Sequence, residues 1–331
     1  MITTEEEEDT VVRWAFAEIM GYLKINHDPY WFKFNPNHMK IHKIMYNVFE
    51  AADIPVTRSW YRYGCFIHSR QLAGFEDFST LKNRYLRSAY PPERLQSAVD
   101  KMGFDTSFVT RKLHEIVDTM PQRMDAYLES LYQNAPRSVG NIYIAKMGFH
   151  NALRDSTKID FRNSQMFQNW FVRVRRALTV FHMSAFSHNQ FNDLACIVMD
   201  FTADVEEALL KIDELIMQRK RVLTKWIKLI HEFSNHFDGD VWLPFALEIS
   251  AQTVKGFRET QVRNQQLLKK KEKILESINE LKLQHAILAE NSLLMSCDDY
   301  RKRLSRVPRD TAVVEALSEL ERIYEKSSES D

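Results

Sequence analysis

The feature that most constrains the fold is a proline-free stretch near the C-terminus, from Ala246 to Ser296, in which apolar residues recur every seven positions. The recurring residues are Leu267, Ile274, Leu281, Leu288 and Met295. A seven-residue apolar repeat is typical of a helix that packs along one seam against another helix. The intervening a positions are mostly polar, so the seam is weak by itself. We therefore expect residues 246–297 to form a long helix with coiled-coil character. This coiled-coil arm is expected to mediate oligomer formation by self-association, or the docking of a protein partner.

The scarcity of turn-forming residues favours a mainly α fold. Glycine occurs 8 times and proline 9 times in 331 residues, which leaves few sites for the tight turns that join short strands. Hydrophobic residues make up 44% of the chain, enough for a folded core, and the length favours more than one domain. Basic and acidic residues both number 45, so no global field attracts nucleic acid or a membrane. Any nucleic-acid contact must therefore come from a local patch.

Proline, glycine and asparagine clusters divide the chain into four predicted parts. Residues 1–72 are expected to form an N-terminal winged-helix-like module, because two helical patterns precede a β element at Val56–Ser69 that is rich in β-branched and aromatic residues. Residues 73–245 are expected to form a helical domain with a sub-boundary near residues 134–141. Residues 246–297 form the arm, and residues 298–331 a short helix and a disordered tail.

The individual helices are predicted from apolar spacing and from capping residues. Thr3 and Thr4 precede four glutamates, which predicts a helix start at Glu5. The predicted helices are Glu5–Leu23, one that begins after Asn37 and ends before Pro55, Pro92–Lys101, Thr106–Thr119, Met124–Gln133, Met166–Phe186, Asn192–Phe237 with a break near residues 217–221, and Thr311–Tyr324.

The cysteine pattern and the N-terminal sequence favour a cytoplasmic protein. Cys65, Cys196 and Cys297 are odd in number and far apart, which fits neither a disulfide framework nor a zinc site. The first nine residues are acidic where a signal peptide is basic and then apolar. No uncharged apolar run reaches the ~18 residues of a membrane span, so we expect no membrane partner.

Residues 37–68 combine an amphipathic helix with an aromatic strand in a pattern that resembles the N-terminal module of the SocA-like, or Panacea, proteins. The matching residues are Lys40, Lys43, Tyr46, Trp60, Tyr63 and Gly64, and Cys65 stands where the family has proline. The resemblance implies a winged-helix-like fold. It also implies a non-enzymatic regulatory or interaction protein of prokaryotic type, as in antitoxins that bind a partner toxin.

Three arginines in and after this aromatic run are the candidate nucleic-acid-binding residues. Arg58, Arg62 and Arg70 interleave with Trp60, Tyr61 and Tyr63. Arginines bind phosphates while aromatic rings stack on bases or pack in a core. The pattern therefore allows local DNA binding and transcription regulation. The alternative is that the aromatic residues are core and the arginines lie on a solvated face.

A second resemblance defines the alternative function. Arg176 is followed by five residues and then His182, which is similar to the Arg-x(4–6)-His motif of HEPN-family ribonucleases. The resemblance implies a helical ribonuclease in which the histidine is a general base and the arginine binds a phosphate. Ala177 replaces the polar residue usual in that family, and a histidine in an apolar helix more often satisfies packing and hydrogen bonding.

Two further clusters contain residue types that are found in binding sites. The mixture of ligand types at His231, Glu232, His236, Asp238 and Asp240 suits a divalent metal, but its spacing matches no known metal motif and fits ordinary helix capping. The basic run Gln218–Lys228 is by default a solvated helix face. We therefore expect no metal, no cofactor and no hydrolytic activity, and we interpret the chain as a protein that acts by binding another protein.

Overall fold

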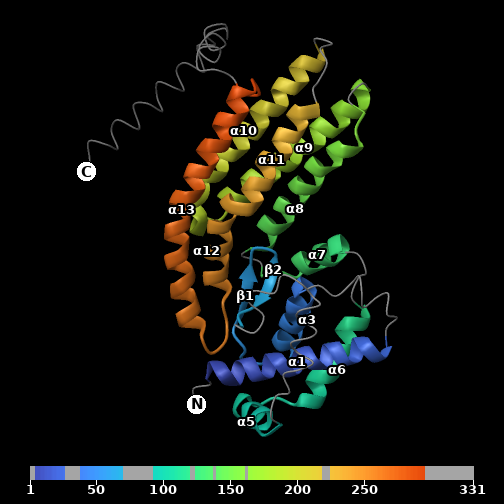
Figure 1. Ribbon diagram of the computed structural model, residues 1–331, viewed down its shortest axis with the longest axis vertical. Coiled ribbons are helices and arrows are strands. Elements are labelled where there is room, and N and C mark those ends of the chain that lie inside the picture. The colour runs from blue at the N-terminus through green and yellow to red at the C-terminus, as the bar shows by residue number, and fades with distance from the viewer. Residues whose placement is uncertain are drawn as a thin grey trace, which may run out of the picture.

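The chain is mainly α-helical and contains one two-stranded sheet among the residues that the structure describes. The structure is a computed structural model. It describes residues 4–26, 38–69, 92–119, 124–136, 139–160, 163–217 and 224–294. Within these ranges the helices form two groups that meet at the hairpin, with α1 lying across one end and α8 to α11 standing side by side at the other (Figure 1). None of the described helices combines the length and the apolar run needed to cross a membrane.

The first two helices begin close to where the sequence predicts them. Helix α1 spans Glu5–Asn26 and α3 spans His38–Ala51. The start of α1 is a capping box, because the Glu7 backbone N–H donates to Thr4 Oγ1 (3.3 Å) while the Thr4 N–H donates to Glu7 Oε2 (2.8 Å). The apolar face of α3, which includes Ile41, Ile44 and Phe49, is buried.

The predicted β element is a hairpin. Strands β1 (Arg58–Tyr61) and β2 (Gly64–Ile67) pair antiparallel, with Trp60 opposite Cys65. Gly64 has a φ of 97°, a backbone conformation that residues other than glycine rarely adopt. The two-residue turn between the strands therefore depends on this glycine.

Helices α5 (Pro92–Met102), α6 (Thr106–Thr119) and α7 (Met124–Gln133) follow. Helices α5 and α6 pack against α1, and α6 also packs against α3. The predicted ranges of α6 and α7 are correct to the residue, and that of α5 to one residue. Their apolar spacing is unbroken, so local sequence was sufficient to predict them.

Helix α8 (Gly140–Arg154) was not predicted. Its sequence begins directly after a cluster of asparagine, proline and glycine and contains a second glycine, Gly148, which weakens a helical pattern. The helix forms nevertheless because Ile142, Tyr143 and Phe149 are buried in the core. Tertiary burial overrides the local signal here.

Helices α9 (Ser164–Phe186) and α10 (Asn192–Met217) form an antiparallel pair beside α8, after the 3-10 turns η1 (Asp155–Lys158) and η2 (Asn189–Phe191). Helix α11 spans Thr224–His236. The predicted break near residues 217–221 coincides with the end of α10, and residues 218–223 lie outside the described ranges.

The C-terminal arm is two helices and not one, which corrects the predicted single helix over 246–297. After the π-helical turn η3 (Phe237–Val241), α12 spans Leu243–Thr253 and α13 spans Glu259–Glu290. The chain reverses at Gly256, whose φ is 114°, so that α12 and α13 pack against each other along the edge of the bundle (Figure 1). The predicted helix Thr311–Tyr324 and the tail after it lie outside the described residues.

The predicted boundaries at residues 72 and 245 do not divide the core. A single cluster of buried apolar residues extends from α1 to α13. The backbones of Arg58 and Lys255 exchange hydrogen bonds of 2.9 Å in both directions, and Ser59 Oγ lies 2.9 Å from Ser250 Oγ. The hairpin is therefore packed directly on the segment that joins α12 to α13.

Candidate functional site

The arginines of the hairpin are engaged within the protein. Arg58 is 4% exposed. Its Nε donates to Glu50 Oε2 at 2.8 Å, and its Nη1 donates to the carbonyl oxygens of Ile54 (2.6 Å) and Val56 (3.1 Å). These bonds leave Arg58 buried, where a phosphate does not reach it. Arg58 therefore fixes the chain between α3 and β1.

The second arginine has a similar role, and the third is not described. Arg62 Nη2 donates to the carbonyl oxygen of Asp238 at 2.7 Å, and its guanidinium lies 5.2 Å from the centre of the Tyr63 ring. Arg70 lies outside the described residues. Arg58 and Arg62 thus connect the hairpin to its neighbours, and the described residues do not bring the predicted set together as an exposed basic patch.

Several residues that carry the SocA-like resemblance converge in the core. The Nζ atom of Lys43 lies 3.6 Å from the position of a Cβ on Gly64, and the Tyr46 and Trp60 rings meet edge to face with centroids 6.2 Å apart. Burial lowers the pKa of Lys43 and raises the pKa of the Cys65 thiol to about 12. These groups pack inside the protein, and the thiol remains protonated at neutral pH.

A buried polar network lies on the opposite side of the hairpin and was not predicted. Glu8, which is 1% exposed, accepts from the Thr57 N–H and from Thr57 Oγ1, both at 2.9 Å. Arg258 Nη2 lies 3.5 Å from Glu8 Oε2 and also donates to the carbonyl oxygen of His68. Glu8 belongs to a run of four glutamates that is typical of a helix start, so no local signal distinguishes it from an exposed residue.

His68 and Ser59 extend this network. The His68 Nε2 atom lies 2.6 Å from Ser59 Oγ, which in turn contacts Ser250. Burial, together with the charge of Arg258, lowers the pKa of His68 to about 4. The histidine is therefore neutral at physiological pH. The arrangement joins α1, the hairpin and α12 through buried hydrogen bonds, which fits a structural role.

Arg176 and His182 point in different directions from α9. They are six positions apart, which corresponds to roughly 240° around a helix. His182 is half-buried, with Nδ1 2.9 Å from Thr202 Oγ1 and its ring stacked on Phe186. Arg176 is exposed to solvent. Within one chain the two side chains do not share a cleft, so the geometry gives His182 a partner on α10 rather than a phosphate-binding arginine.

The cluster near residue 236 is divided among several partners. His231 Nε2 contacts Ser156 Oγ. Asp238 pairs with Lys146 at 2.8 Å and with His150 at 3.1 Å. These partners hold the pKa of Asp238 below its ordinary value despite its burial. No group of three metal-ligating side chains is found in the part of the chain that the structure describes.

The basic run is described only in part. Residues 218–223 lie outside the described ranges. Lys225 on α11 is exposed, and Lys228 lies 3.2 Å from Glu232 one turn later in the same helix. The described lysines therefore lie on an ordinary charged helix face.

The heptad seam of α13 faces the protein itself. Leu281 and Leu288 are buried, Ile274 packs against the core, and Leu267 is half-buried. Their partners are α12, α10, α11 and the η3 turn. The innermost residues of the seam therefore pack on helices of the same chain. The outer face of α13 instead exposes Leu268, Leu275 and Leu283, with exposed fractions of 63%, 69% and 55%.

A groove lies where α10 and α13 run side by side. It has a volume of about 580 Å³ and is lined by Cys196, Asp200, Asp204, Lys282 and His285 above an apolar floor. His285 Nδ1 lies 3.0 Å from Asp204 Oδ2. Burial raises the pKa of Asp204, and the histidine opposes this effect. The groove presents both signs of charge beside the outer leucines of α13.

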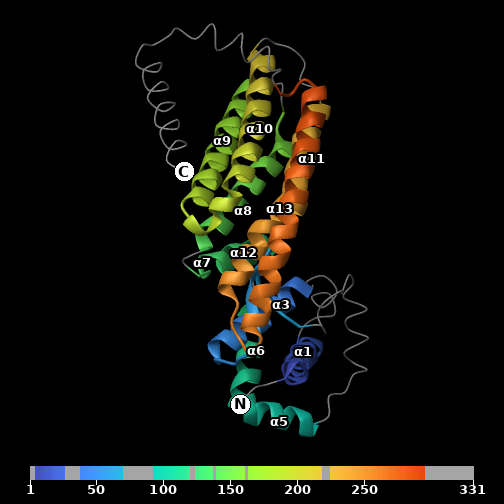
Figure 2. The same ribbon diagram turned by 90° about the vertical axis from the view of Figure 1, so that its left-hand side faces the viewer.

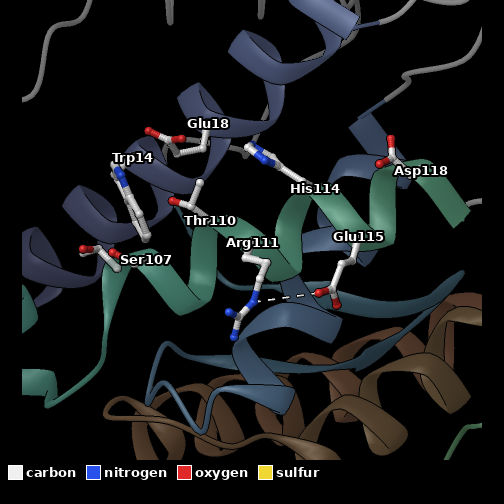
Figure 3. A pocket seen from close by; sticks show the side chains of 9 residues that line it. Trp14, Glu18, Ser107, Thr110, Arg111, His114, Glu115 and Asp118 are labelled. Carbon is white, nitrogen blue, oxygen red and sulfur yellow. Dashed lines mark ion pairs between the residues drawn. The ribbon is translucent and has the colours of Figure 1, made fainter.

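A further cleft lies between α1 and α6 (Figure 3). Its volume is about 590 Å³, and its lining residues are Trp14, Glu18, Thr106, Ser107, Thr110, Arg111, His114, Glu115 and Asp118. Trp14 and Glu18 project from α1 toward Thr110 and His114 on α6 (Figure 3). Arg111 is 3.9 Å from Glu115.

The histidine of this cleft is held by aromatic stacking. The Tyr22 ring stacks on His114 with centroids 3.8 Å apart, and the Tyr22 hydroxyl donates to Asp118 Oδ2 at 2.6 Å. The hydrogen bond to Asp118 raises the pKa of Tyr22. The cleft offers hydroxyl and carboxylate groups for hydrogen bonding, and the Asp118 carboxylate already accepts the Tyr22 hydroxyl.

The fold and these sites define a mainly α-helical protein whose described polar clusters are occupied by internal contacts. A family model described as a domain of unknown function (DUF8098) matches residues 93–325. The match covers more than half of the 331 residues, so the chain belongs to this family. No curated protein and no solved structure matches the chain. Helices α1 and α3 and the hairpin precede the matched region.

Proposed function

We propose that this protein is a non-enzymatic interaction protein that self-associates through the outer face of α13. The observation that carries the proposal is the row of exposed leucines Leu268, Leu275 and Leu283. They are seven and eight positions apart, so they lie on one side of the helix. Burial of these leucines against a partner would contribute about 25 cal/mol of binding free energy per Å² of apolar surface removed from water. A long helix with such a row is a typical oligomerisation element.

The charges beside the leucines favour a second copy of the same chain as the occupant. Lys271, Glu272 and Lys282 are exposed on the same side of α13. In an antiparallel pair whose two-fold axis passes near residue 277, Lys282 of each copy lies opposite Glu272 of the other. Leu268 then lies opposite Ala286, which leaves room for the leucine. A face with both signs of charge is complementary to itself, as an isologous interface requires.

Light scattering of the full chain tests this proposal. We expect the wild-type mass to be twice the chain mass of 39.1 kDa, and we expect Leu275→Glu to reduce it to 39.1 kDa. Leu210→Glu is the matched control, because Leu210 is a leucine of α10 with 41% exposure. This control is expected to leave the mass unchanged. A wild-type monomer, or a Leu275→Glu protein that keeps the full mass, contradicts the proposal.

The regulatory roles implied by the N-terminal resemblance remain predictions. Neutralisation of a toxin, transcription regulation and a winged-helix-like module rest on the sequence pattern of residues 37–68. DNA binding loses support from the contacts of Arg58 and Arg62, and the ribonuclease alternative loses support from the divergence of Arg176 and His182. A cytoplasmic location likewise stays a prediction.

A further inference from the structure

The solvent face of α9 is apolar and basic. Val172, Arg176, Val180 and Met183 follow one another at spacings of four, four and three residues, which places them in one row. The exposed fractions of the three apolar residues are 61%, 49% and 62%. The helix contains three arginines and no acidic residue. Unlike the outer face of α13, this face is therefore not complementary to itself.

Arg176 differs from the other two arginines of this helix. Arg173 pairs with Asp155 at 2.9 Å, and Arg175 pairs with Glu206. Among the described residues Arg176 forms no ion pair, although it lies in the middle of the apolar row. A cation flanked by exposed apolar side chains fits an amphipathic helix that carries carboxylates beside its apolar face.

The chain itself contains a segment of this kind beyond the last described residue. Between Arg309 and Asp331 there are seven acidic and three basic residues. Apolar residues recur in it at helical spacing, at Val313, Leu317, Leu320 and Tyr324. The acidic residues nearest to them are Glu315, Glu319, Glu321 and Glu325. The family match extends to residue 325, so this segment belongs to the family domain.

The end of α13 lies close enough for the segment to reach α9. Gln168 on α9 donates to Asp213 on α10 at 2.7 Å, so α9 begins where α10 ends. Lys270 and His285 of α13 contact Asp193 and Asp204 of α10, so α13 runs in the same direction as α10 and ends about two turns before it. Residues 295–310 can span about 50 Å when extended. Two helix-to-helix steps from α13 across α10 to α9 require only about 20 Å. Figure 2 shows α9 and α13 on opposite sides of α10.

We propose that residues 311–324 pack as an amphipathic helix on the row formed by Val172, Arg176, Val180 and Met183. The apolar residues of the segment cover the valines and the methionine. Arg176 forms an ion pair with a glutamate of the segment. This contact is separate from the self-association through α13, so either proposal stands if the other fails.

Hydrogen–deuterium exchange of the full chain, read by mass spectrometry, tests the proposal. The reference is a synthetic peptide of residues 309–331, because an isolated helix of this length is marginal in water. We expect the amides of residues 311–324 to exchange at least about tenfold more slowly in the full chain than in the peptide. The double variant Arg176→Glu, Met183→Asp is expected to return them to the peptide rate.

Two further variants separate this proposal from a general loss of structure. Lys225→Glu makes the same charge reversal on an exposed residue of α11 and is expected to retain the protection. Adding Glu315→Lys and Glu319→Lys to Arg176→Glu is expected to restore protection that Arg176→Glu alone reduces. Exchange at the peptide rate in the wild type overturns the proposal. Protection that survives the double variant, or that rises with protein concentration, also overturns it, because the segment is then covered elsewhere or by another copy.

Discussion

Gly256 packs so closely on Thr57 that a Cβ at position 256 would lie 2.6 Å from the Thr57 Cα and 2.7 Å from its nitrogen. The φ of 114° at Gly256 is also one that L-residues rarely adopt. These two constraints place the reversal between α12 and α13 against the start of the hairpin. The turn that doubles the arm back is therefore fixed by a contact with a residue almost two hundred positions earlier in the sequence.

Replacing Gly256 by alanine is therefore expected to destabilise the protein. The clash involves backbone atoms that cannot move aside, and the left-handed φ adds strain of order 1–3 kcal/mol. Urea denaturation followed by circular dichroism measures the change in the free energy of unfolding. Gly148→Ala is the control, because a Cβ at Gly148 meets no atom within 4 Å, and it is expected to stabilise α8 slightly. Equal stability of the two variants would show that the turn relaxes.

The second prediction concerns acid sensitivity and His68. Its pKa is lowered to about 4 in the folded protein from 6.5, so the unfolded chain binds a proton first as the pH falls. The contribution of the neutral histidine to the free energy of unfolding is complete above pH 6.5 and declines as the pH falls toward 4. It amounts to about 2 kcal/mol between pH 7.5 and pH 5. Urea unfolding at these two pH values measures it.

The His68→Gln variant isolates this contribution. Glutamine keeps a hydrogen-bonding group near Ser59 but does not titrate. We expect its free energy of unfolding to fall less between the two pH values than that of the wild type. An identical fall in both proteins would assign the acid sensitivity to other groups, such as His231, whose pKa is also lowered by burial.

The third prediction is a double-mutant cycle on Glu8 and Arg258. Arg258→Met leaves the Glu8 carboxylate buried without that cation and is expected to cost about 3 kcal/mol in the free energy of unfolding. Glu8→Gln keeps a hydrogen-bond acceptor for Thr57 and is expected to cost less. The double variant is expected to be more stable than the sum of the two single effects predicts, since the pair is coupled. Additive effects, measured by urea denaturation, would show that the two residues act independently.

The fourth prediction is that Lys43→Met does not destabilise the protein at pH 7. Lys43 is 2% exposed, and burial lowers its pKa, so its charged form is disfavoured in the folded state. Methionine fills a similar volume without that cost, and a gain of about 1 kcal/mol is expected. The gain should shrink as the pH rises toward the ordinary lysine pKa, because the unfolded lysine then loses its proton too. Lys269→Met, an exposed change on α13, serves as the control. A clear loss of stability in Lys43→Met would show that the amine makes a necessary polar contact.

Local sequence was enough to predict most of the helices and the hairpin. Thr4 and Glu7 form the capping box that their spacing indicates. The apolar period of α6 locates both of its ends, and the aromatic run around Gly64 forms the expected β element, which is a pair of strands. These features depend on neighbours within a few positions, so periodicity and capping chemistry are sufficient to find them.

The tertiary structure decided the features that depend on distant residues. Helix α8 forms because the core buries Tyr143, and the arm folds back because Gly256 meets Thr57. The roles of charged residues were also outside the reach of sequence. Arg58 is buried because Glu50 and two backbone carbonyl oxygens accept its hydrogen bonds, while Arg176 is exposed to solvent on α9. A sequence states which side chains carry charge or apolar surface. Their burial and their partners depend on which segments pack together, and the free energy of that packing is shared among residues far apart in the chain.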